Sequence, residues 1–138
     1  MSAALEDAAL ARGGAVAAAA RAMLGVRFRA QGRGAEGVDC VGLVAVALAA
    51  GGYAGPVPRG YRLRGGDPER VAAQLDRVLV RGDGEQVGDL LLCASGPGQL
   101  HLAIRVEDGI VHADAGLRRV VERPGEVPWP LIGAWRLG

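Results

Sequence analysis

The chain has 138 residues, enough to bury a hydrophobic core as a single domain. Half of its residues are hydrophobic and 22% are charged, which is ordinary for a soluble globular protein. All 16 basic residues are arginines spread along the chain, and 15 acidic residues nearly balance them, so no clustered basic patch points to nucleic acid. The longest apolar run, residues 41–50, is too short to cross a bilayer.

The first residues predict where the protein is made. Glu6 and Asp7 stand where a secretory signal needs basic residues, so we expect synthesis in the cytoplasm without a signal peptide. Export would then depend on some other machine. The two cysteines are expected to be free thiols in that compartment.

The first half of the chain predicts helices. Residues 1–13 are interpreted as an N-terminal extension, followed by one domain over residues 14–138. Helices are expected over about 15–24, 40–50 and 68–78, with Gly or an Asp-Pro pair at their ends. Between the second and third lies a long loop, residues 53–66, of the kind that is usually functional or mobile.

The second half predicts strands. Short apolar runs over about 90–94, 100–106, 110–114, 118–122 and 132–137 are separated by turn residues. Because the helices come first and the strands follow, the pattern favours an α+β fold, with helices packed on a mainly antiparallel sheet of about five strands.

The most informative stretch runs from Gly37 to Val44. Asp39 is a good helix N-cap, which places Cys40 in the first turn, near the positive end of the helix dipole. A cysteine there loses its proton more easily, so Cys40 has the setting of a nucleophile. Gly42 lets another chain or a substrate approach the first turn. The competing interpretation is a small buried cysteine that begins a core helix.

Both histidines lie in one predicted hairpin, and its register decides whether they meet. A two-residue loop, Asp108-Gly109, would pair His112 with Arg105 and leave the rings too far apart. A four-residue loop, Val106 to Gly109, would instead pair His112 with Ala103, which makes the histidines diagonal neighbours and sets Asp114 opposite His101. We prefer this second register, although the Asp-Gly pair argues for the first.

Cys40, His101 and His112 would then form a Cys-His-X triad. The thiolate–imidazolium pair of Cys40 and His101 would attack an amide carbonyl, and His112 would orient the His101 ring. Backbone N–H groups at the start of the Cys40 helix, including that of Val41, are the natural oxyanion hole.

Five segments carry a resemblance to a known family. They are Phe28-Arg29-Ala30-Gln31-Gly32, Gly37 to Val44, Gly88-Asp89-Leu90-Leu91, His101-Leu102-Ala103-Ile104 and Ile110-Val111-His112-Ala113. In this order they resemble the catalytic stretch and strand motifs of the NlpC/p60 cell-wall peptidases, in particular the short, signal-less peptidases of phage tails and gene transfer agents. The resemblance covers about residues 15–137.

The resemblance implies a papain-like core and a thiol protease that cleaves peptidoglycan stem peptides, commonly between D-glutamate and a diamino acid. It assigns Cys40 as nucleophile, His101 as base and His112 as the orienting residue. It also implies possible partners among phage-type tail or baseplate proteins and delivery to the wall in a phage-like particle. No cofactor, metal, nucleic acid or membrane is implied.

Two departures from the family concern the oxyanion site. The family commonly has Tyr where this chain has Phe28, and usually Ser where it has Val41. Phe28 packs but donates no hydrogen bond, so the hole is expected to be weaker or completed elsewhere. Weaker expectations concern substrate binding: Asp114 beside the histidines, and Tyr53, Arg59, Tyr61, Arg62 and Arg64 in the long loop, whose arginines could meet stem-peptide carboxylates or be solvated.

Two rival functions stay open at this point. Cys40, His101 and His112 could hold a catalytic zinc ion, although no short-spaced ligand pair supports it. Alternatively the chain is a non-catalytic module that binds wall peptide or a tail protein, which Phe28 favours. Cys93 is expected in the core, and Trp129 and Trp135 against the sheet rather than on a sugar or partner.

Overall fold

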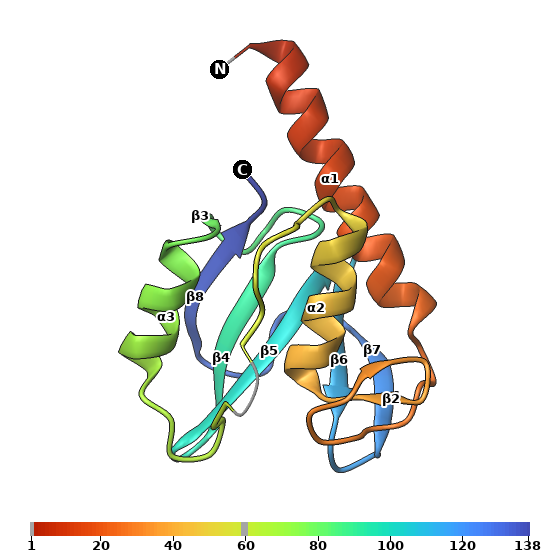
Figure 1. The fold of residues 1–138 in the computed structure, drawn as a ribbon, viewed down its shortest axis with the longest axis vertical. Coiled ribbons are helices and arrows are strands. Elements are labelled where there is room, and N and C mark those ends of the chain that lie inside the picture. The colour runs from red at the N-terminus through yellow and green to blue at the C-terminus, as the bar shows by residue number, and fades with distance from the viewer. Residues whose placement is uncertain (1, 59–60) are drawn as a thin grey trace.

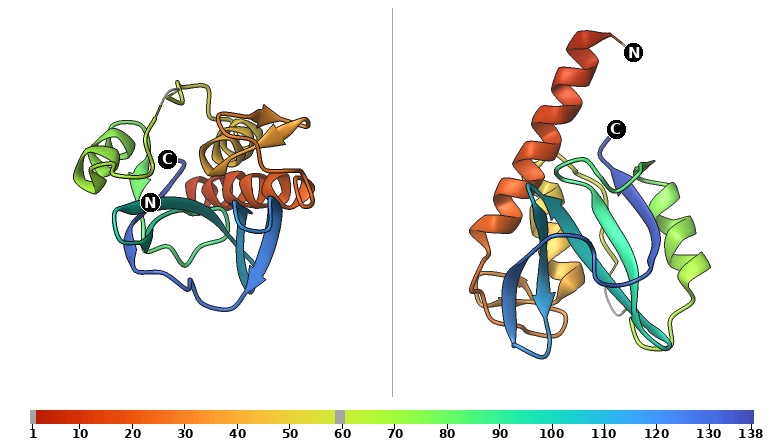
Figure 2. Two further views of the ribbon diagram at one scale, coloured as in Figure 1. Left: turned by 90° about the horizontal axis from the view of Figure 1, so that it is seen from below. Right: turned by 180° about the vertical axis from the view of Figure 1, so that it is seen from behind.

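In the computed structural model, which describes residues 2–58 and 61–138, three helices cover one face of a six-stranded sheet (Figure 1). The segment between the last two strands crosses the opposite face (Figure 2). The predicted α+β architecture, with helices on an antiparallel sheet, is therefore confirmed. None of the helices within the described ranges is long and apolar enough to span a membrane.

The first helix is longer than the sequence predicts. Helix α1 runs over Ala3–Ala22, with Ser2 as its N-cap, and so includes most of the residues interpreted as an extension. Gly13 does not end it. A Cβ at Gly13 would lie 2.5 Å from the carbonyl oxygen of Val87, so glycine here permits close contact with the sheet. Arg12 also donates a 2.6 Å hydrogen bond to the carbonyl of Gly138, which ties the C-terminus to α1.

The other two helices begin at the predicted caps. Helix α2, Cys40–Ala50, begins after Asp39 and ends at Gly51, as predicted. Helix α3, Pro68–Asp76, begins after Asp67 with proline in its first turn and ends two residues before the predicted boundary.

The sheet has one strand more than expected. The strands are β3 (Val80–Arg81), β4 (Leu90–Gly96), β5 (Gln99–Val106), β6 (Gly109–Asp114), β7 (Arg119–Pro124) and β8 (Leu131–Arg136). Their order across the sheet is β3-β8-β4-β5-β6-β7, and every neighbouring pair is antiparallel. The additional strand is the short β3. A separate two-stranded sheet, β1 (Arg33–Gly34) and β2 (Gly37–Val38), leads into α2.

Alternate side chains of the strands build two cores, one on each face of the sheet. Leu90, Leu102 and Ile104 belong to the larger core, under the helices. Leu91, Cys93 and Ala103 belong to the smaller core, beneath the crossing segment. Trp135 packs as predicted: it is fully buried in the larger core, and its indole N–H donates to Asp76 at 2.8 Å.

Candidate active site

Asp39 organises the first turn of α2. One carboxylate oxygen accepts the N–H of Gly42 at 2.8 Å, and the other accepts the N–H of Gln31 at 2.7 Å and the hydroxyl of Tyr61. The close approach that Gly42 permits is made by the preceding loop of the same chain and not by a substrate. A Cβ at Gly42 would lie 1.7 Å from the carbonyl oxygen of Gly32. The glycine-rich approach is thus locked against the helix that begins at Cys40.

Cys40 lies in the predicted first helical turn, but its thiol is not activated at rest. The residue is only 2% exposed, and burial raises the pKa of the thiol to about 12. Backbone hydrogen bonds from Leu102, Val41 and Cys40 itself act in the opposite direction, and the Asp39 charge adds to the rise. The expectation of an easily ionised thiol was therefore wrong for this state, because burial outweighs the helix start.

The hairpin has the preferred register. Ile104 pairs with Val111 and Val106 with Gly109, so Glu107-Asp108 is the turn and His112 falls level with Ala103. Asp108 adopts a φ of 63° there. Hydrogen-bonded pairing of β5 and β6 ends at Ile104 and Val111, so Asp114 is level with His101 without being joined to it by the ladder.

Helix α2 packs against both β5 and β6 (Figure 1). The backbone of Leu102, in the part of β5 that β6 does not pair, lies close enough to the Cys40 thiol to lower its pKa against the effect of burial. His101 directly precedes Leu102. The end of α2 that carries the thiol therefore meets β5 at Leu102. The side chain of His101, the residue before it, belongs to the opposite sheet face, with Cys93 and Trp129.

The two histidines form the hydrogen bond that the register predicts. His101 Nε2 lies 2.9 Å from His112 Nδ1, with the rings perpendicular and their centroids 5.0 Å apart. Burial, together with the charge of His112, lowers the pKa of His101 to about 4, while Asp114 opposes the shift. Burial also lowers the pKa of His112. Both shifts favour the neutral rings.

This burial predicts a loss of stability in acid. The unfolded chain takes up a proton on His101 near its ordinary pKa of 6.5, but the folded chain does so only near 4. Between these values the unfolded state binds more protons, so the free energy of unfolding falls with falling pH, by about 3 kcal/mol for this group. We expect His101→Gln to lose less stability between these pH values in denaturant titrations. Parallel pH profiles for the two proteins would contradict this.

Trp129 was not predicted as part of this site. Its ring meets His101 at 5.0 Å and His112 at 5.1 Å between centroids, edge-on to both. It lies on the segment that crosses the sheet face opposite the helices (Figure 2). Trp129 thus covers the histidine pair, and the only sequence signal was its place between two prolines, in a loop close to the last strand.

The remaining predicted residues have different surroundings. Tyr61 reaches Asp39, whereas Arg62 is exposed at the rim of a neighbouring trough. Asp114 accepts the N–H of Leu117 at 3.0 Å and acts on the histidines through its charge. Phe28 packs against the larger core, and Arg59 lies outside the described residues.

The structure also bears on Cys93 and on the zinc hypothesis. Cys93 is fully buried in the smaller core, as predicted, and pairs across strands with His101. Burial raises the pKa of its thiol to about 11. Within residues 2–58 and 61–138, no three His, Cys, Asp or Glu side chains are placed to hold a metal ion, so the zinc hypothesis gains no support.

The arrangement of α2 against an antiparallel sheet recurs in solved structures. An NlpC/p60 family protein from Bacillus cereus matches with a TM-score of 0.66 and 22% identity, over 90% of this chain and 39% of its own. The NlpC/p60 domain of the peptidoglycan hydrolase SagA matches with a TM-score of 0.61 and 23% identity, over 91% and 98%. This chain has the NlpC/p60 fold.

A third structure with this fold is the peptidoglycan hydrolase RipB from Mycobacterium tuberculosis, with a TM-score of 0.58 and 24% identity, over 91% of this chain and 64% of RipB. The chain therefore spans less than half of the Bacillus cereus protein and nearly all of the SagA domain. No family model and no curated protein matches the sequence. At these identities the likeness to NlpC/p60 structures shows the fold alone.

Proposed function

We propose that this protein is a cysteine peptidase that hydrolyses peptidoglycan stem peptides, with Cys40 as nucleophile, His101 as base and His112 as the orienting residue. The observation that carries the proposal is the 2.9 Å bond between His101 Nε2 and His112 Nδ1, on the strand whose next residue, Leu102, acts on the pKa of the Cys40 thiol. The NlpC/p60 fold, which SagA and RipB share, supports the choice of substrate.

The hydrogen bonding assigns a task to each nitrogen of His101. Because Nε2 is engaged by His112, Nδ1 is the nitrogen left to accept the thiol proton. Sulfur then attacks the amide carbonyl, the C–N bond breaks, and His101 returns the proton to the departing amine. Water hydrolyses the thioester and restores the thiol.

The pKa shifts make this a neutral pair at rest. With the thiol pKa near 12 and the imidazole pKa near 4, Cys40 and His101 are both uncharged at pH 7. Proton transfer therefore accompanies attack, in place of the preformed thiolate–imidazolium pair that the sequence predicts. Backbone N–H groups of Cys40 and Val41, which favour the charged sulfur, are available to an oxyanion as well.

Finer aspects of the proposal follow from the family resemblance. The bond cleaved is the one between D-glutamate and the diamino acid, and the enzyme is made in the cytoplasm and carried to the wall with phage-type tail or baseplate proteins. Digestion of defined muropeptides, with mass analysis of the products, tests both the activity and the bond. Intact muropeptides after incubation with folded protein would contradict the proposal.

Phe28 favours the second candidate, a non-catalytic module that binds wall peptide or a tail protein, because it lacks the hydroxyl that the family commonly has here. We expect Phe28→Tyr to raise the turnover number several-fold, since a single oxyanion donor is worth about 100-fold or more. Steady-state kinetics on one muropeptide measures the change. An unchanged rate would mean that other donors, such as the backbone N–H groups at the start of α2, already complete the site.

A further inference from the structure

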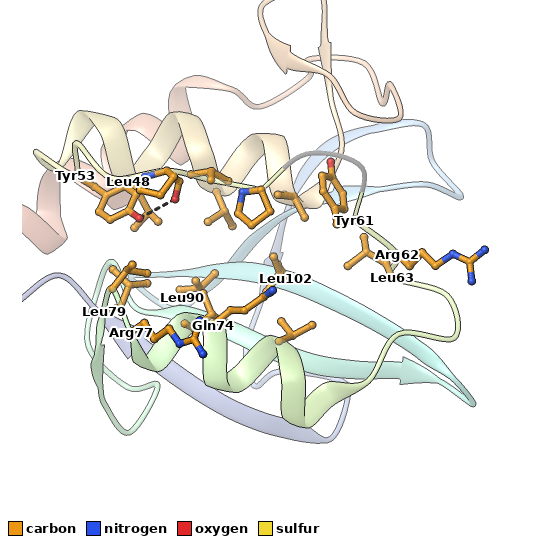
Figure 3. Close-up of a pocket in the computed structure, with 18 residues that line it drawn as sticks. Leu48, Tyr53, Tyr61, Arg62, Leu63, Gln74, Arg77, Leu79, Leu90 and Leu102 are labelled. Atoms are coloured by element: carbon orange, nitrogen blue, oxygen red, sulfur yellow. Dashed lines mark hydrogen bonds between the residues drawn. The ribbon is translucent and has the colours of Figure 1, made fainter.

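An apolar trough lies between α2, α3 and the loop that joins them (Figure 3). It encloses about 310 Å³, at the lower end of the range for small-molecule sites. Helix α2 forms one wall with Val44 and Leu48, and helix α3 forms the other with Val71 and Leu75. Leu90 of β4 and Leu102 of β5 form the floor. Described residues of the long loop, among them Tyr53, Val57 and Tyr61, complete the lining.

One end of the trough lies at the start of α2. Val41, in the first turn of the helix, lines that end, and Leu102 lines the floor. From Val41 to Leu48 the trough follows α2 for about 10 Å, at 1.5 Å per residue. Its shape is therefore that of a narrow channel leading away from the nucleophile.

The lining suits an aliphatic chain better than a peptide. Nearly all of the side chains are aliphatic, proline or aromatic, so the N–H and C=O groups of a bound peptide would lose water without gaining partners. A run of methylene groups has no such cost and gains from leaving water.

The charges of the trough are of one sign. Arg62 and Arg77 are the only charged side chains among its described lining residues, and they stand at opposite ends of the row (Figure 3). Neither guanidinium has a hydrogen-bond or ion-pair partner among the residues that the structure describes. An occupant with a negative head group would satisfy one of them.

We propose that this trough binds a monomeric fatty acid, with its aliphatic chain along α2 and its carboxylate at Arg62 or Arg77. The proposal goes beyond hydrolysis of wall peptides and does not rest on it, because the site is defined by its own lining and charge. It assigns this fold a second class of ligand, in a trough that follows α2.

Calorimetric titration of the whole protein with dodecanoate, kept below its micelle concentration, tests the proposal. We expect saturable one-to-one binding. Gln74→Trp fills the trough and Val78→Asp places a charge in it, and both positions are exposed, so the variants should fold. Each should weaken binding by about tenfold or more. Leu117→Asp, at an exposed leucine outside the trough, is the matched control and should bind normally.

A second arm tests the charge. The double variant Arg62→Glu, Arg77→Glu should lose affinity for dodecanoate but keep its affinity for the neutral dodecanol. Absence of saturable binding, equal losses in Val78→Asp and Leu117→Asp, or binding only to vesicles that contain the fatty acid would overturn the proposal. Muropeptide digestion, measured separately, would still decide the peptidase proposal.

Discussion

Cys40→Ala is expected to abolish hydrolysis of wall peptides while the protein still folds. The helix that begins at Cys40 is held by the Asp39 cap and by apolar packing, neither of which uses the sulfur. Removing a small buried group should cost about 1 kcal/mol of stability. Cys40→Ser should be inactive as well, since a hydroxyl is the weaker nucleophile. Mass analysis of muropeptide digests, beside thermal unfolding, measures both effects.

Cys93→Ala is the matched control, because Cys93 is also buried and the same atoms are removed. It should lose a similar amount of stability and keep its activity. Full activity in Cys40→Ala would end the nucleophile assignment. A folded but inactive Cys93→Ala would instead move that role to the cysteine paired with His101 across the sheet.

The second large effect concerns the group that orients His101. His112 holds Nε2 of His101 at 2.9 Å, whereas the carboxylate of Asp114 is occupied by the N–H of Leu117. We expect His112→Ala to lower the turnover number by about 100-fold or more, in the range of a lost acid–base partner. The side chains in His112→Asn and His112→Gln can still accept or donate a hydrogen bond, so these variants should have turnover numbers between those of His112→Ala and the unchanged protein.

Asp114→Asn is the companion variant. Asp114 raises the pKa of both histidines through its charge, so its loss should lower the pKa of His101 further and alter the pH profile more than the maximal rate. Kinetics of the four variants from about pH 5 to about pH 9 separates these effects. If Asp114→Asn proved the more damaging change, the assignment of His112 would have to be abandoned.

Local signals predicted the parts of this site that depend on neighbours in sequence. The Asp39 cap fixed where α2 begins, and strand alternation with a single choice of register was enough to bring His101 to His112. The α+β class followed in the same way from helices preceding strands. These features depend on hydrogen bonding and periodicity within a few residues, which a sequence records directly.

The features that were missed depend on tertiary packing. Burial of Cys40 reverses the expected direction of its pKa, and no local pattern records how much of the chain covers a side chain. Trp129 reaches the histidines only because its segment crosses the far face of the sheet. Gly13 looked like a helix stop, but the sequence alone could not indicate the strand lying against it.

The placement of α1 bears on how the protein could be attached to other objects. Helix α1 begins at the end of the molecule opposite the first turn of α2, and the C-terminus lies toward that same end, bonded to Arg12 (Figure 1). A bead, surface or fused domain joined at either terminus would therefore lie at the end of the molecule away from Cys40. Tethered in this way, the molecule would turn the end that holds the start of α2 away from the support, toward an insoluble polymer in the medium.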